Sequence, residues 1–190
     1  MQKLLKTLTD YHPQNEQETH DKMLMLTFLK RHPDALYRTN LTAHMTSSIV
    51  VLNPSKTKIL LGFHRIYHAW GWFGGHSDGE EDSYAVALKE VQEETGLTQF
   101  TAAPSDIIAL DVIGVQNHLK QGVYVPDHLH LNVTYGFYAP DDVPLNHNIS
   151  EHKAIQWFAL ENFLDHIDEA RMKPIYQKIV TRMLAGHKKR

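Results

Sequence analysis

Residues 128–138 alternate strictly between apolar and polar side chains, and this pattern constrains the fold more than any other feature of the sequence. The apolar positions are Leu129, Leu131, Val133, Tyr135 and Phe137, and the polar ones are His128, His130, Asn132 and Thr134. A period of two is typical of a β-strand with one face on a core. The segment therefore predicts a strand within a sheet.

The polar face of this predicted strand is unusual, because internal strands of a covered sheet are mostly apolar on both faces. Two interpretations stay open. In the first, the face lines a wet cleft in which His128 and His130 bind substrate, joined by His44, Thr46 and Ser48. In the second, the strand lies at an edge, or its histidines are buried with satisfied hydrogen bonds.

The rest of the chain mixes further strands with helices, which predicts an α/β fold with a helix-covered sheet. Residues 53–55, Asn-Pro-Ser, form a turn signal between two β-branched segments and so predict a hairpin. The predicted strands are 44–52, 58–63, 107–115 and 154–158, and the predicted helices are 83–95, 160–166 and 174–184.

The first forty residues form a predicted helical extension, residues 1–40, ahead of a main domain at residues 41–190. Leu4, Leu5 and Leu8 make a short apolar stripe, and residues 16–31 carry a broader apolar face at helical spacing. We expect the extension to pack on the main domain. The alternative is a lid or a dimer surface, so a homodimer is compatible with the sequence.

Composition narrows the classes of function. The net charge of −3 predicts no binding to nucleic acid or to an anionic membrane. The chain has no cysteine, which excludes disulfides, thiolate zinc sites and a cysteine nucleophile. With neither a signal peptide nor a long apolar segment in view, we expect a cytoplasmic protein.

Three glutamates lie close together on the predicted helix 83–95. At 100° per residue, Glu90, Glu93 and Glu94 share one sector beside the apolar stripe that faces the core. Like charges so close destabilise a helix by a few tenths of a kcal/mol, and a divalent cation reverses the sign of that effect. An all-oxygen cluster suits Mg²⁺ or Mn²⁺. The alternative is a solvated acidic face.

The segment 75–97 resembles the Nudix box. Gly75 precedes Glu81 by five intervening residues, and after seven more comes the sequence KEVQEETGL at 89–97. Eight of nine specified positions fit, with Lys89 in place of the family's arginine. The resemblance implies a Nudix-type α/β/α sandwich with a mixed sheet, and a magnesium- or manganese-dependent pyrophosphohydrolase.

The resemblance also implies roles for individual residues. Glu90, Glu93 and Glu94 would bind the metal, and Glu93 or Glu94 would help to activate water. The carbonyl group of Gly75 would face the metal.

Three further residues, Glu81, Lys89 and Gly96, would brace the motif. Lys89 would pair with Glu81, although lysine lacks the planar fork of arginine. Gly96 would end the helix.

Candidate residues outside the box are less sharply defined. In several family members a glutamate in a late loop reaches the metals or acts as general base; Glu151 would match it, or be a surface charge. Trp70, Trp72 and Phe73 would stack on a nucleobase or anchor their loop in the core. The remaining histidines have no spacing that predicts a metal site, including His64, His68, His76 and His118.

The predicted substrate is a small molecule, a nucleoside diphosphate linked to another moiety. The rival interpretation is a nucleotide sensor of the same fold, but such domains often lose a box glutamate. The isomerase that shares this fold relies on a cysteine. Residues 111–114 lack the proline common in ADP-ribose hydrolases; the tyrosine of diadenosine polyphosphate hydrolases and the upstream motif of coenzyme A diphosphatases are also absent.

Overall fold

The computed structural model describes residues 1–103, 107–120, 122–146 and 150–185. A mixed eight-stranded sheet forms its centre, with β10, β2, β1, β9 and β5 side by side. Strands β3, β4 and β6 pair with β2, β1 and β9 in turn. The strands of this sheet are β1 Ala43–Leu52, β2 Lys58–His64, β3 Trp70–Gly71, β4 Phe73–His76, β5 Thr101–Ala102, β6 Ala109–Val115, β9 His128–Tyr138 and β10 His152–Ala159.

Strands β1 and β9 are parallel along their whole length, from Ala43 opposite Leu129 to Leu52 opposite Tyr138. All other pairings are antiparallel. Strand β9 lies along one edge of β1. The other edge of β1 pairs with β2 and β4. A small separate hairpin consists of β7 His118–Lys120 and β8 Val123–Val125.

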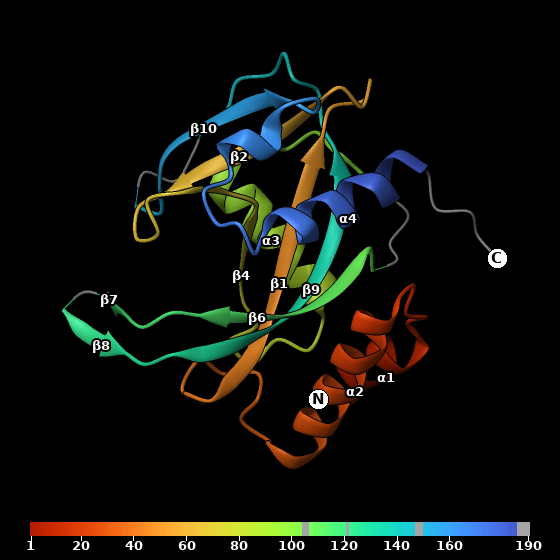
Figure 1. Cartoon of the computed structure of the whole chain (residues 1–190), viewed down its shortest axis with the longest axis vertical. Coiled ribbons are helices and arrows are strands. Elements are labelled where there is room, and N and C mark those ends of the chain that lie inside the picture. Colours follow the sequence, from red (N-terminus) through yellow and green to blue (C-terminus); the bar gives the residue numbers. More distant parts are fainter. Residues whose placement is uncertain (104–106, 121, 147–149, 186–190) are drawn as a thin grey trace.

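Helices cover both faces of the sheet (Figure 1). Apolar residues of α1, α2 and α3 join one core cluster with alternate residues of β1 and β9. Residues of α4 join a second cluster with Val50 and Leu52, on the opposite face. The helical elements are α1 Gln2–Asp10, α2 Glu16–Arg31, α3 Ser83–Thr95, the 3₁₀ turn η1 Phe163–His166 and α4 Lys173–Ala185. The predicted α/β/α sandwich with an N-terminal helical extension is confirmed.

The two faces of β1 differ in polarity along the strand. On the α4 side, its final residues Val50 and Leu52 enter the second core, whereas His44, Thr46 and Ser48 precede them on the same face. The polar half of this face is the part that is available for a site.

Strand β9 has the bounds that its alternation predicts, but the edge-strand interpretation is wrong, since β9 lies between β1 and both β5 and β6. The predicted helix at 160–166 is only the short turn η1. Helices α1 and α2 form the predicted N-terminal extension. The division between this extension and the main domain at residue 40 stays a prediction. None of the helices among the described residues has the length and apolar character needed to cross a membrane.

Candidate active site

Helix α3 begins and ends where its sequence predicts. The side chain of Asp82 accepts hydrogen bonds from two backbone N–H groups of the first turn, at 3.1 and 3.2 Å. Gly96 ends the helix with φ of 68°, a left-handed conformation that favours glycine. Ala87 and Val91 are buried in the core and fix which side of α3 faces the sheet.

Glu94 is the most buried glutamate of α3, with 3% of its surface exposed. Its Oε2 accepts a hydrogen bond from the backbone N–H of Gly74, at 2.8 Å. Its Oε1 lies 2.8 Å from Nε2 of His152. Burial raises the pKa of Glu94 and outweighs these contacts, which lower it. Glu94 is thus held in one position at an energetic cost to its charged form.

Glu90 lies directly against the backbone of Gly75. A Cβ atom at Gly75 would come within 2.4 Å of the carboxyl carbon of Glu90, so any larger residue would displace this carboxylate. Burial raises the pKa of Glu90 to about 7, and the nearby carboxylate of Glu94 adds to the rise while Lys89 opposes it. Lys89, 4.0 Å away and largely exposed, balances the charge of this carboxylate only in part.

Glu93 is different, because 54% of its side chain is exposed. Nζ of Lys89 lies 3.4 Å from Glu93 and 4.0 Å from Glu90. The predicted pairing of Lys89 with Glu81 is therefore wrong. Glu81 instead pairs with the N-terminal ammonium of Met1 and accepts the backbone N–H of Lys3, so helix α1 occupies the place expected for Lys89.

Glu151 joins Glu94 from the start of β10. Glu94, Glu151 and His152 each offer a ligand atom, and these atoms lie within 4.8 Å of one another. Among the described residues, the three glutamates of α3 do not form such a group by themselves. Clustered carboxylate oxygens suit a hard divalent cation, and such an ion would offset the cost that burial places on the charges of Glu90 and Glu94.

His152 is a site residue that the sequence did not reveal. It is buried, and its Nδ1 has no hydrogen-bond partner among the described residues. Its only signal was its position next to Glu151. The pairing of β10 with β2 brings it to Glu94, and that pairing cannot be read locally.

A cavity of about 460 Å³ lies beside these glutamates. Its floor is the polar face of β1 and β9, and Glu94 and Gly75 reach it from the motif. Its other walls include Trp70, Trp72, Gln116, His118, Arg171 and Tyr176. The cavity therefore connects the carboxylates to both aromatic and polar surfaces.

The floor of the cavity is a closed hydrogen-bond network. Oδ1 of Asn132 accepts from Thr46 at 2.9 Å and from Ser48 at 2.8 Å, and its amide donates to Thr134 at 3.0 Å. Thr46, Ser48 and Asn132 line the cavity with their hydrogen bonds satisfied, whereas Nε2 of His44, on the same face, has no hydrogen-bond partner among the described residues. His130 lines it as well.

Two of the expected cleft residues lie elsewhere. His128 and His44 are not among the described residues that line the main cavity; His128 borders a separate shallow depression. The substrate contact predicted for His128 is therefore not supported by its place in the fold.

All three aromatic residues ahead of the box contact a core, and two of them also line the cavity. Phe73 is fully buried in the core and anchors its strand. Trp70 and Trp72 line the cavity, and their rings pack against Phe158 and Tyr176 at centroid distances of 4.8 and 4.9 Å.

Solved structures share this fold. A C. elegans Ap4A hydrolase is 24% identical, with 75% of this chain and 98% of that one covered and a TM-score of 0.53. A MutT protein from Methanosarcina mazei Go1 is 18% identical, with 73% and 93% covered and a TM-score of 0.54. An E. coli dihydroneopterin triphosphate pyrophosphohydrolase is 14% identical, with 74% and 95% covered and a TM-score of 0.53.

A search of curated proteins gave no match. The NUDIX domain, by contrast, matches residues 42–179, which is well over half of the chain and contains both the glutamate helix and the cavity. The chain belongs to the Nudix family.

Proposed function

We propose that this Nudix protein is a magnesium- or manganese-dependent pyrophosphohydrolase that cleaves a nucleoside diphosphate linked to another moiety. The observation that carries the proposal is the pair of neighbouring carboxylates, Glu90 and Glu94, whose pKa values burial raises beside a cavity that Glu94 lines. Family membership supports the reaction class.

Glu90, Glu94 and Glu151 are the residues proposed to hold the metal, with Glu93 completing the set. The exposed ion pair between Glu93 and Lys89 stabilises the protein by less than about 1 kcal/mol, so a divalent cation would readily compete for this carboxylate. A bound metal ion would neutralise phosphate charge and lower the pKa of a bound water. His152 fixes the orientation of Glu94, as a second-layer residue does.

A proton acceptor is required near the attacking water, and Glu93, Glu94 and Glu151 are the proposed candidates. Both oxygens of Glu94 already accept hydrogen bonds, whereas Glu93 and Glu151 are exposed to solvent. This difference favours Glu93 or Glu151 for the acceptor and Glu94 for metal binding.

The rest of the cavity is proposed to hold the organic part of the substrate. Trp70 and Trp72 offer faces for a base. Arg171, whose side chain is 49% exposed, offers a guanidinium group for a phosphate. His130 contributes from the floor, and the proposal of a cytoplasmic enzyme without nucleic-acid or membrane partners is retained.

The test is a panel of substrates with Mg²⁺ or Mn²⁺, with release of phosphate, pyrophosphate and nucleoside monophosphate measured. Ap4A, dihydroneopterin triphosphate, nucleoside triphosphates and nucleotide sugars belong in the panel. Glu94→Gln and Glu93→Gln should lower turnover by on the order of 10³-fold, the loss of several kcal/mol of metal-dependent stabilisation.

Glu16→Gln, on the exposed side of α2, is the matched control and should keep full turnover. Wild-type turnover in Glu94→Gln, with contaminating hydrolases excluded, would refute the assignment. Tight nucleotide binding without metal-dependent cleavage would identify the chain as a sensor instead.

A further inference from the structure

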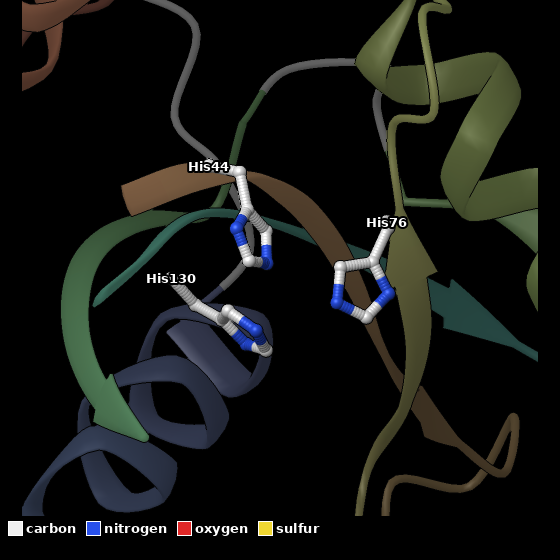
Figure 2. Close-up of side chains that lie close together, drawn as sticks. All are labelled: His44, His76 and His130. Carbon is white, nitrogen blue, oxygen red and sulfur yellow. The ribbon is translucent and has the colours of Figure 1, made fainter. Parts of the chain in front are cut away.

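Three histidines converge on the polar face, in a group that shares no residue with the cluster of Glu94, Glu151 and His152. His44 belongs to β1, His76 ends β4 and His130 belongs to β9. Their ring centroids form a nearly equilateral triangle, with sides of 5.0, 5.0 and 5.1 Å. One ligand nitrogen from each lies within 4.8 Å of the others. Figure 2 shows the three rings turned toward a common centre.

The register of the sheet creates this convergence. His44 lies opposite His130 in the parallel pair β1–β9, and His76 lies opposite Thr46 in the antiparallel pair β1–β4. Because cross-strand partners point to the same face, as do residues two apart in one strand, all three imidazoles share one face. The geometry is therefore a property of three rigid strands and not of a loop.

Hydrogen bonding fixes the tautomer of His44. Its Nδ1 lies 3.0 Å from the backbone carbonyl of Asn40, which can only accept, so Nδ1 carries the proton. Its Nε2 is then a bare lone pair. That atom is buried and has no hydrogen-bond partner among the described residues, and the residue is only 3% exposed. This buried lone pair is therefore free to bind a ligand.

A relay of hydrogen bonds fixes His130 in the same way. Nδ1 of His128 lies 2.8 Å from the carbonyl of Pro126 and must donate to it. Nε2 of His128 can then accept from Nε2 of His130, at 3.3 Å. This leaves Nδ1 of His130 as a lone pair, while the ring of His76 makes no hydrogen bond within the described chain.

The three rings are held in the uncharged form. Burial lowers the pKa of His76 to about 3, with Arg38 and His44 adding to the effect. Burial also lowers the pKa of His130 to about 2, with His76 and His44 adding to it. Neutral imidazoles repel no cation and attract no phosphate, and they are the form in which histidine binds metals.

We propose that His44, His76 and His130 form a second metal site that binds a transition-metal ion of the zinc type, separate from the carboxylate site. With a Zn–N bond of about 2.0–2.1 Å, tetrahedral angles separate the ring centroids by about 5 Å, as they are separated here. Imidazole selects Zn²⁺ and its neighbours, whereas Mg²⁺ requires oxygen ligands. The proposal does not depend on the hydrolase activity.

The fourth position of this site would be open. His76 and His130 both line the main cavity, so the ion would face the space proposed for substrate. Three histidines with one free position are typical of zinc ions that bind water or a substrate oxygen. The class of ligand for the free position is therefore water or an oxygen atom of a phosphorylated substrate.

The test is a titration of the metal-free, full-length protein with Co²⁺ in excess Mg²⁺, which occupies oxygen sites and leaves imidazoles free. Four-coordinate Co²⁺ has strong visible absorption, and we expect it with one ion per chain. His76→Ala and His130→Ala should each weaken binding by more than about 100-fold, beyond the effect typical of second-layer residues. His128→Ala, which removes the hydrogen bond to His130 and the ring stacked on His44 but no ligand, should weaken it by about 10- to 100-fold.

Two controls separate this site from other histidines and from the carboxylates. His20→Ala removes an exposed histidine of α2 and should leave Co²⁺ binding unchanged, as should Glu90→Gln. Zinc X-ray absorption of the wild-type protein, expected to show three imidazole ligands, does not depend on the folding of any variant. Weak, six-coordinate Co²⁺ binding, or binding that survives in folded His76→Ala and His130→Ala but is lost in Glu90→Gln, would overturn the proposal.

Discussion

Two groups of buried carboxylates in this protein differ in how their charge is balanced. Glu18 of α2 is fully buried between the N-terminal helices, β6 and α4. Arg182 of α4 donates to it at 2.5 and 3.2 Å, and Tyr11 donates at 2.9 Å. Burial alone would raise the pKa of Glu18, but Arg182 and the backbone N–H of Gln14 hold it below its ordinary value.

Glu90 of α3 is also largely buried but has no such partner. Its nearest cation, Lys89, lies 4.0 Å away with 64% of its side chain exposed, and the pKa of Glu90 is about 7. The charge of Glu18 is thus satisfied inside the chain and serves to join elements. Among the described residues, Glu90 has only the exposed Lys89 near it, so its charge is available to a bound cation.

A neighbouring carboxylate that shares Lys178 with Glu18 shows how much one lysine can do. Asp111 of β6 lies 2.6 Å from Lys178, yet burial outweighs this contact and raises the pKa of Asp111 to about 6. Only Glu18, with a bidentate guanidinium and further donors, is fully compensated. The comparison therefore predicts opposite responses to mutation, metal and pH in the two regions.

The largest expected effect is on stability at Glu18. Glu18→Ala leaves Arg182 buried without its partner and should lower the free energy of unfolding by about 3–5 kcal/mol. Urea unfolding followed by circular dichroism measures it, with the exposed Glu16→Ala on the same helix as control. A loss below about 1 kcal/mol would mean that Glu18 does not join the extension to the sheet.

Added Mg²⁺ should stabilise the protein through the carboxylate site of α3 and Glu151, and not through the region of Glu18. At a concentration about 100 times its Kd, Mg²⁺ should raise the free energy of unfolding by about 2.7 kcal/mol. Glu94→Gln should remove most of this gain, whereas Glu16→Ala should keep it. Thermal unfolding with and without Mg²⁺ checks the expectation, and equal gains in Glu94→Gln and the wild type would place the ion elsewhere.

Without metal, Glu90→Gln should stabilise the protein at pH 8 by on the order of 1–2 kcal/mol. The pKa of Glu90 rises from 4.5 to about 7 on folding, so its charge opposes folding. This penalty is absent below pH 4.5, grows as the pH rises toward 7 and is complete above it. Urea unfolding at pH 4 and pH 8 should show the gain only at pH 8; a loss of stability at pH 8 would contradict the account.

The pH dependence at Glu18 has the opposite sign. Its folded-state pKa is lowered, so its contribution is complete above the ordinary pKa of glutamate and is lost as the pH falls through the folded value. The difference in stability between the wild type and Glu18→Ala should therefore shrink in acid, in the same measurements.

The smallest effect should be at Lys89. Its contacts with Glu93 and Glu90 are exposed or long, so Lys89→Ala should change the free energy of unfolding by no more than about 0.5 kcal/mol. Lys3→Ala, on α1 near the same loop, is a suitable comparison. If Lys89→Ala lowered the free energy of unfolding by more than about 1 kcal/mol, Lys89 would brace the motif through a contact that the structure does not show.

Local features were predictable from the sequence, and long-range ones were not. The ends of α3 follow from Asp82 and Gly96, and the extent of β9 follows from its alternation, because capping and periodicity are local. The placement of His152 beside Glu94 depends on the pairing of β10 with β2. No local pattern carries that information.

The histidine triangle illustrates the same limit more strongly. His44, His76 and His130 are far apart in the sequence, and their meeting depends on β4 and β9 flanking β1 in one register. The wrong pairing of Lys89 with Glu81 has a related cause, since helix α1 lies against Glu81 and places the N-terminus there. Lys89 is left in solvent beside Glu93.

A crystal structure of the full chain grown with saturating Mn²⁺, with anomalous scattering recorded at the manganese edge, tests the central claim most directly. The account predicts at least one manganese peak bound by Glu90, Glu94 and Glu151, with Glu18 and its cations free of metal. No peak beside α3, with the glutamates still bare at saturating Mn²⁺, would contradict it.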